Sequence, residues 1–277
     1  MSTATVPAAA IAIGDSHPGD DAIAAAYARD GYAHGGSVLD LATVERLRTE
    51  LARVIADHGR PGLAQPYRLM NMGGESPVWQ IVNIWQGSAD FASLLRHPRI
   101  LDLAGRLSGA RSLRLWHDQI QYKPAAVGGV NMWHQDAPYW GPLGPQDQQI
   151  TAWIALDDAD QDNGCMSMVP GSHRWGNAID FLQALPDFAA MPTGYAGNDV
   201  RVDVRPVLAG HVHFHHSLTW HGSPANRSGR PRRAIALHFM SERTVLASDR
   251  HHPLRDEIRS APGEPVRGAR FPELWWA

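Results

Sequence analysis

The stretch Arg232-Arg233-Ala234-Ile235-Ala236-Leu237-His238-Phe239 alternates small or polar residues with large ones. A period of two is typical of a β-strand, because successive side chains of a strand point to opposite faces of the sheet. One face then carries Arg232, Ala234, Ala236 and His238, and the other carries Arg233, Ile235, Leu237 and Phe239. The first face is small, so we expect it to border a cavity that has Arg232 at one wall. The plain alternative is that the small residues face another packed strand and that Arg232 is solvated.

Two histidines and one aspartate form the clearest candidate site upstream of this strand. In Trp133-His134-Gln135-Asp136, an extended backbone would place His134 and Asp136 on the same face, and His221 follows much later in the chain. Two histidines and a carboxylate on one side of a metal ion suit a non-haem Fe(II) oxygenase, whose open positions bind a co-substrate and oxygen. The same ligands also suit a Zn(II) or Mn(II) hydrolase or isomerase. Histidines within residues 211–216 could compete with His221 as ligands.

Several further blocks occur together with these residues in one order along the chain. They are residues 153–159 (Trp-Ile-Ala-Leu-Asp-Asp-Ala), 162–165 (Asp-Asn-Gly-Cys), 169–173 (Val-Pro-Gly-Ser-His), His221-Gly222-Ser223, Asn226 and Arg232. In this combination the chain resembles the phytanoyl-CoA dioxygenase-like (PhyH) family of Fe(II)/2-oxoglutarate-dependent oxygenases, from about residue 25 to about residue 241. Each block alone is weak, but their order and spacing together are specific.

The resemblance implies iron ligation by His134, Asp136 and His221. It implies that Arg232 binds the 2-oxoglutarate carboxylate with Ser223 beside it, as the two-pronged guanidinium geometry allows. The expected activity is hydroxylation of an unactivated C–H bond of a small molecule, with O2 consumed and succinate and CO2 released. Related halogenases have a small residue at the position of Asp136, so Asp136 favours hydroxylation or a related oxidation over halogenation. Desaturation, epoxidation or cyclisation with the same cofactors stays open, as does a non-catalytic sensing role.

Other side chains are candidates for contacts with the co-substrate or the substrate. Gln119 and Gln121 alternate onto one face of a strand, and we expect their amides to bind 2-oxoglutarate if that face is interior. Trp153 is a wall of the same site by family position, or a core residue. Glycines and aromatics near residues 65–90 suggest a lid. The predicted substrate contacts are Asn83 and Trp85 from this segment, with Tyr139 and Trp140 after the iron motif.

Composition fits an ordinary enzyme of one large domain. The chain has 277 residues, of which 44% are hydrophobic, and we expect a flexible lead-in over residues 1–19 and one domain over 20–277. A net charge of −3 argues against nucleic-acid binding and weakens the case for a CoA thioester substrate. No apolar run approaches the length of a membrane span. The single cysteine, Cys165, allows no internal disulfide, which fits a cytoplasmic protein. Oligomeric state is left open.

The pattern along the chain predicts helices first and strands afterwards. Helices are expected over residues 22–29, 41–58 and 91–107, the last interrupted at Pro98, and strands over residues 112–122, 151–157, 167–169, 202–207, 212–216 and 232–240. An apolar stripe on the second helix predicts packing against the core. We therefore expect a mainly β fold with flanking helices: a double-stranded β-helix of the jelly-roll type, a cupin-like barrel buttressed by N-terminal helices.

Overall fold

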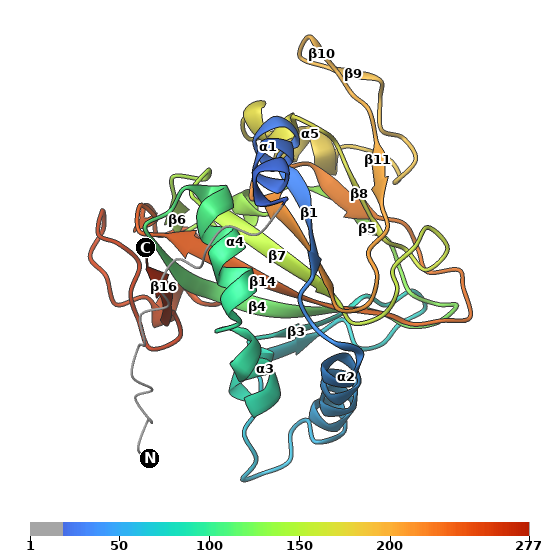
Figure 1. The fold of residues 1–277 in the computed structure, drawn as a ribbon, viewed down its shortest axis with the longest axis vertical. Helices are drawn as coiled ribbons and strands as arrows, with labels where there is room; N and C mark the ends of the chain where they lie inside the picture. The colour runs from blue at the N-terminus through green and yellow to red at the C-terminus, as the bar shows by residue number, and fades with distance from the viewer. Residues whose placement is uncertain (1–18, 277) are drawn as a thin grey trace.

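The computed structural model describes residues 19–276, so the expected lead-in lies almost wholly outside the described residues. Its largest element is an eight-stranded antiparallel sheet, the major sheet, in the order β1-β12-β7-β14-β4-β3-β2, with β16 paired beside β4 (Figure 1). The strands are β1 (Tyr32–Ser37), β2 (Arg68–Met70), β3 (Trp79–Val82), β4 (Ser112–Lys123), β7 (Gln149–Ala155), β12 (His211–His216), β14 (Arg232–Ser241) and β16 (Glu273–Trp276). The long central strand β14 hydrogen bonds to β4 on one side and β7 on the other.

A smaller antiparallel sheet, the minor sheet, has the order β11-β8-β13-β5. Its strands are β11 (Asp203–Arg205), β8 (Met166–Met168), β13 (His221–Ser223) and β5 (Asn131–His134). Two short antiparallel pairs complete the strands: β6 (Leu143–Gly144) with the distant β15 (Val245–Leu246), and the hairpin of β9 (Gly194–Tyr195) with β10 (Asn198–Asp199). Side chains from both sheets meet in the interior. The expected mainly β, cupin-like fold is confirmed, although among the described residues the two sheets are not hydrogen bonded into a closed barrel.

Helices cover the outer face of the major sheet (Figure 1). They are α1 (Asp20–Asp30), α2 (Leu41–Ala56), α3 (Ala89–Leu94) and α4 (Pro98–Ser108), whereas α5 (Ile179–Gln183) packs against β5 of the minor sheet. The short 3-10 turns are η1 (Ile84–Gln86), η2 (Ala137–Tyr139), η3 (Ser172–Arg174) and η4 (Arg255–Glu257). Helix α2 begins where the Asp40 side chain accepts from the backbone N–H of Thr43, which is a typical N-cap. Pro98 is the first residue of α4, where its missing N–H costs nothing, so the expected interruption is a boundary between two helices.

The two faces of β14 have different roles, as its alternation predicts. Ile235, Leu237 and Phe239 lie in the main core together with the apolar stripe of α2. Ala234 and Ala236 face the interior between the sheets, where they pack with Trp153. Every residue from Ala234 to Met240 is buried. The helix-facing side of the sheet therefore supplies the core, and the other side is left for the site.

The segments at 65–90 and at the C-terminal end of the described chain both add strands to the major sheet. Strands β2 and β3 extend the sheet beyond β4, so in this structure the expected lid segment is a wall of the interior. The Trp275 side chain is buried, and a Cβ added at Gly105 would lie 2.5 Å from it. The tryptophan-containing tail thus folds back onto the domain.

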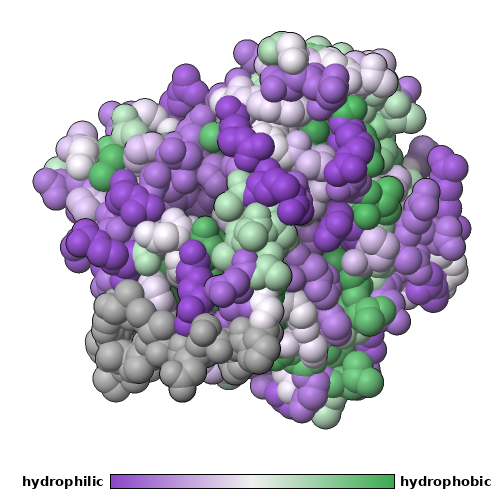
Figure 2. All heavy atoms as spheres, turned by 45° about the horizontal axis from the view of Figure 1, so that its top comes forward, coloured by the Kyte–Doolittle hydropathy of each residue, from purple (hydrophilic) through white to green (hydrophobic). Residues whose placement is uncertain are grey.

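The surface gives no sign of a bilayer-crossing element in the described part of the chain. Among residues 19–276 no helix has the length and apolarity that a membrane span needs. The face in Figure 2 is mostly hydrophilic, and its hydrophobic residues form small groups. Such a mixture is ordinary, since apolar atoms make up more than half of a typical protein surface.

Candidate metal centre and adjoining cavity

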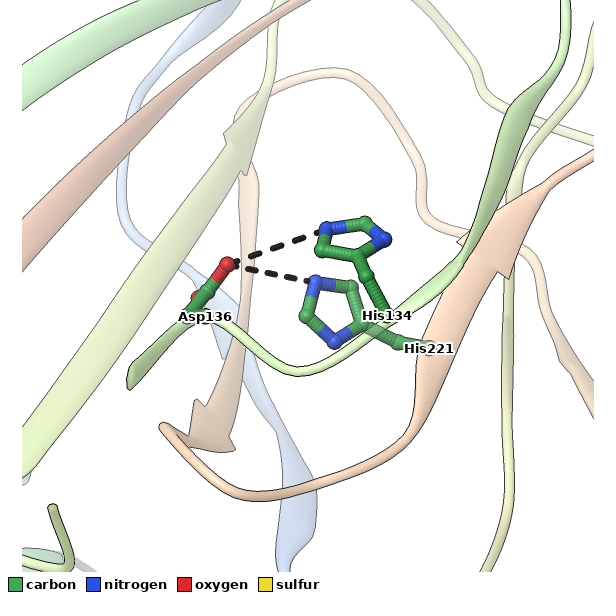
Figure 3. A group of neighbouring side chains, drawn as sticks. All are labelled: His134, Asp136 and His221. Atoms are coloured by element: carbon green, nitrogen blue, oxygen red, sulfur yellow. Dashed lines mark ion pairs between the residues drawn. The ribbon is translucent and has the colours of Figure 1, made fainter. Parts of the chain in front are cut away.

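His134, Asp136 and His221 come together at one end of the minor sheet (Figure 3). His134 ends β5, His221 begins β13, and these two residues are direct partners across the strand pair. The Oδ1 atom of Asp136 lies 3.8 Å from Nε2 of His134 and 3.6 Å from Nε2 of His221. The candidate ligand atoms all lie within 4.8 Å of one another, a spacing that one metal ion can bridge.

The expectation that His134 and Asp136 meet by strand alternation is wrong. Strand β5 ends at His134, and Asp136 has helical backbone angles as the residue before η2. The two side chains therefore do not meet by strand alternation. The turn itself directs the Asp136 carboxylate back toward the imidazoles (Figure 3).

Backbone carbonyls fix the orientation of both histidines. Nδ1 of His134 lies 2.7 Å from the carbonyl oxygen of Met132, and Nδ1 of His221 lies 2.9 Å from that of Thr219. A carbonyl only accepts, so each Nδ1 carries the proton and each Nε2 keeps its lone pair. Both lone pairs are thus on the nitrogens nearest Asp136, as metal ligation requires.

The second oxygen of Asp136 is held by the major sheet. Oδ2 accepts from Thr151 Oγ1 at 3.0 Å and from His215 Nε2 at 3.1 Å, which leaves Oδ1 for a metal. Neither Thr151 nor His215 was among the residues predicted for the site. Strand alternation could have placed both side chains on the interior faces of β7 and β12. That prediction would also have required knowing that the two sheets face each other. His215, one of the competing histidines of residues 211–216, supports the carboxylate, and His221 is the residue in the ligand cluster.

The protonation states suit a divalent cation. Burial lowers the pKa of His134 and of His221 to about 4, so both imidazoles are neutral near pH 7. Burial alone would raise the pKa of Asp136, but His221 and His215 outweigh it and hold that pKa well below its usual value. Two neutral imidazoles and one carboxylate form the donor set of non-haem Fe(II) sites, and the residues present therefore fit that ion.

A second interior site is built around Arg232 at the start of β14. Arg232 is fully buried; it donates to the backbone oxygen of Gln121 at 3.3 Å and to Ser223 Oγ at 3.4 Å, both long contacts. Its guanidinium lies over the Trp153 ring at 5.6 Å, and its Nε has no partner among the described residues. Burial lowers the pKa of Arg232 to about 10, which still leaves it charged at pH 7. A buried guanidinium with weak, incomplete partners fits an anionic ligand such as a carboxylate.

Lys123 is a buried amine next to Arg232, and it is the chain's single lysine. The two residues are direct partners in the pairing of β4 with β14, and Lys123 Nζ donates to the carbonyl oxygens of Ser223 and Pro224. Burial, and then the charge of Arg232, lower the pKa of Lys123 to about 5. Lys123 thus fixes the backbone that carries Ser223, a role that the sequence did not reveal.

A cavity of about 810 Å³ adjoins the metal ligands. Of the residues predicted for the site, His134, Asp136, Gln119, Gln121, Tyr139 and Trp140 line it. The lining does not include Arg232, so the expectation that Arg232 forms a cavity wall is wrong for this structure. Gln121 connects the two regions, because its side-chain oxygen accepts from Trp153 Nε1 at 3.1 Å.

Asn83 and Trp85 do not line the cavity, which corrects their predicted role as substrate contacts. Asn83 is fully buried with φ of 53°, and its side chain accepts from the backbone N–H of Asp118. The Asp118 carboxylate in turn accepts from the backbone N–H groups of Ile84 and Trp85. Asn83 tolerates the left-handed conformation better than most residues, so its role is to shape the turn after β3.

A double-stranded β-helix with two histidines and one carboxylate beside an internal cavity defines a metal-binding cupin-like protein. The family model described as phytanoyl-CoA dioxygenase (PhyH) matches residues 27–234, three quarters of the chain. The chain therefore belongs to the phytanoyl-CoA dioxygenase family, as its motifs predict.

Several relatives are similar over most of the chain. Peroxisomal phytanoyl-CoA dioxygenase of Bos taurus is 26% identical over 77% of this chain, which spans 66% of that enzyme's length. Among solved structures, the 2-oxoglutarate-dependent carbocyclase SnoK from nogalamycin biosynthesis is 29% identical with a TM-score of 0.75, covering 96% of this chain and 99% of its own. The epimerase SnoN, solved with Fe3+, 2-oxoglutarate and nogalamycin RO, is 26% identical with a TM-score of 0.71, covering 92% and 98%.

Proposed function

We propose that the protein is an Fe(II)- and 2-oxoglutarate-dependent oxygenase that hydroxylates a C–H bond of a small molecule. In this proposal His134, Asp136 and His221 hold iron, and Arg232 with Ser223 holds the far carboxylate of 2-oxoglutarate. The observation that carries the proposal is that the interior holds two different polar sites. One site has three metal-ligand atoms that suit a cation, and the other has a buried, incompletely paired guanidinium that suits an anion. Family membership supports the same assignment.

The chain's own residues position and isolate the reactants. Gln119 and Gln121 line the cavity beside the metal ligands, where their amide groups can donate to 2-oxoglutarate oxygens. Thr151 and His215 hold one oxygen of Asp136 so that the other faces the metal position. Bound iron, with 2-oxoglutarate and O2, supplies the oxidising power and releases succinate and CO2. The protein's contribution is a dry interior in which a substrate C–H bond is held close to the metal position.

Cyclisation is a second candidate outcome, which the likeness to SnoK favours, since that enzyme is named a carbocyclase. The ligand set is the same for both outcomes, and the placement of the substrate decides between them. A Zn(II) or Mn(II) hydrolase is more remote, because such chemistry gives no role to the buried Arg232. Product analysis separates the first two, and dependence on O2 and 2-oxoglutarate separates both from the third.

The test is an anaerobic titration of the apo-protein with Fe(II) and then 2-oxoglutarate, followed by the visible charge-transfer band of a chelated keto acid. We expect the band in the wild type and in Arg230→Ala, a control at an exposed arginine. In Arg232→Ala, 2-oxoglutarate affinity should fall by about 100-fold, the expected cost of losing a buried charged partner. Bound iron without a band in the wild type would overturn the oxygenase proposal and favour the hydrolase.

A further inference from the structure

The side chain of His238 is buried in the cavity wall and belongs neither to the metal ligands nor to the Arg232 site. It lies on the interior face of β14, is 3% exposed and lines the cavity next to Asp136. Its Nδ1 is 2.8 Å from Thr151 Oγ1, and its Nε2 has no partner among the described residues. A buried, unpaired ring nitrogen is costly, so it points to a ligand that completes it.

The hydrogen-bond chain from Asp136 fixes which nitrogen of His238 carries the proton. The Asp136 carboxylate can only accept, so the Thr151 hydroxyl uses its one proton to donate to Oδ2. The Thr151 oxygen must then accept from His238, which places the His238 proton on Nδ1. With the proton on Nδ1, Nε2 is a lone-pair acceptor.

The rest of the cavity wall carries little charge. Among its lining residues the cations are limited to the exposed Arg68, and Asp136 is the one carboxylate. Burial lowers the pKa of His117 to about 3 and that of His252 to about 4, so these two cavity histidines are also neutral. Apolar walls come from Trp140, Leu182 and Leu254, each of which is buried. A volume of about 810 Å³ is at the upper end of the range for small-molecule sites.

We infer that the cavity takes a large, uncharged and mainly apolar substrate, and that Nε2 of His238 accepts a hydrogen bond from a hydroxyl or N–H group of that substrate. This inference rests on the proposed function only in taking the cavity beside Asp136 as the substrate site. His238 is thereby a specificity-determining residue, because it orients the substrate by binding the substrate's donor group. The hydrogen bonds of Thr151 to both His238 and Asp136 fix where that donor group lies relative to Asp136. A polyanionic thioester fits this wall poorly, because its phosphates would need several cations.

The test uses 2-naphthol and 2-methoxynaphthalene, which share a ring body and differ in whether their oxygen can donate. Binding to the full apo-chain is measured by calorimetry, without iron, 2-oxoglutarate or O2. We expect the wild type to prefer the naphthol by about five- to tenfold, the worth of one buried hydrogen bond. His238→Phe should lose the preference while binding the ether as before, and His251→Phe, a control at an exposed histidine, should keep it.

A second measurement does not depend on the folding of a variant. Long-range proton–nitrogen NMR of the wild type should find the proton of His238 on Nδ1, with an Nε2 signal that shifts when the naphthol is added. Equal affinity for the two probes, binding of neither, or a proton on Nε2 would each overturn the inference. Since no readout uses turnover, a failed iron and 2-oxoglutarate titration would overturn the proposed function and leave these results standing.

Discussion

The two polar regions of the interior differ in how completely their own side chains satisfy them. At the metal centre each non-ligand atom is engaged: the two Nδ1 atoms donate to carbonyls, and Oδ2 of Asp136 accepts twice. At the other region, Arg232 is a buried cation, and burial lowers the pKa of the neighbouring Lys123 to about 5. The Asp157 carboxylate, whose charge acts on Arg232, is already paired with Arg233 at 2.7 Å.

This difference matches the proposed ligands of the two regions, a metal cation at one and a carboxylate at the other. At the metal centre the supporting bonds all come from the protein itself, and the three ligand atoms face one another. The Arg232 region keeps an unsatisfied Nε and two long contacts, so an arriving carboxylate would gain bonds that the protein does not make by itself. The following experiments would break or sharpen the contrast.

The largest effect should come from Asp136→Ala. Removal of the one carboxylate takes away both a ligand and the negative charge of the centre, so we expect Fe(II) affinity to fall by more than about 100-fold, beyond the usual effect of outer partners. The control is Asp249→Ala, at an exposed aspartate. Fe(II) affinity is measured by competition with a chromogenic chelator, and an affinity within a factor of three of the wild type would remove Asp136 from the centre.

Acid should destabilise the apo-protein through the buried neutral histidines. The folded pKa of His117, about 3, lies below the ordinary 6.5, so the unfolded chain binds more protons between these values. The free energy of unfolding should thus be constant for this group above pH 6.5 and fall as the pH drops toward 4, by at most about 1.4 kcal/mol per pH unit. Urea unfolding at several pH values measures it. The slope should be shallower in His117→Gln, and an unchanged slope would contradict the assignment.

Thr151→Val tests the support given to Asp136 from the major sheet. The substitution keeps the shape of the side chain and removes the hydroxyl that holds Oδ2. We expect Fe(II) affinity to fall by at least about tenfold, as is usual when an outer-shell bond is lost. Thr193→Val, at an exposed threonine, is the matched control. Equal affinities in the two variants would mean that His215 alone orients the carboxylate.

Lys123→Met should give the smallest effect and should act on the Arg232 region alone. The variant keeps an apolar stem of similar length but removes the hydrogen bonds to the carbonyls of Ser223 and Pro224. We expect 2-oxoglutarate affinity to fall about fivefold, since the backbone that carries Ser223 loses its hydrogen bonds to Lys123, while Fe(II) affinity stays unchanged. A parallel loss of Fe(II) affinity would show that the two regions are not independent.

Sequence patterns predicted the parts that depend on local alternation or on motif order. The faces of β14, the stripe of α2 and the cluster of His134 with His221 all follow from residues that repeat or recur in a known order. The predicted substrate contact at Asn83 was wrong because a segment rich in glycine and aromatic residues suggests a mobile lid. The position of Asn83 depends instead on a hydrogen bond with Asp118, which lies 35 residues away in the sequence. The roles of Thr151 and His215 could not be assigned from a single strand, because both side chains reach Asp136 across the gap between the two sheets.

The alternation of side chains along β14 also limits which insertions and substitutions this fold can accept during evolution. Arg232, Ala234, Ala236 and His238 occupy even positions of a strand that is paired on both sides, with one irregularity after His238. Insertion of one residue between Arg232 and His238 would turn half of this set toward the helices. New substrates can therefore be accommodated by replacing even-numbered residues or by lengthening the segments between strands, whereas the length of β14 itself is fixed.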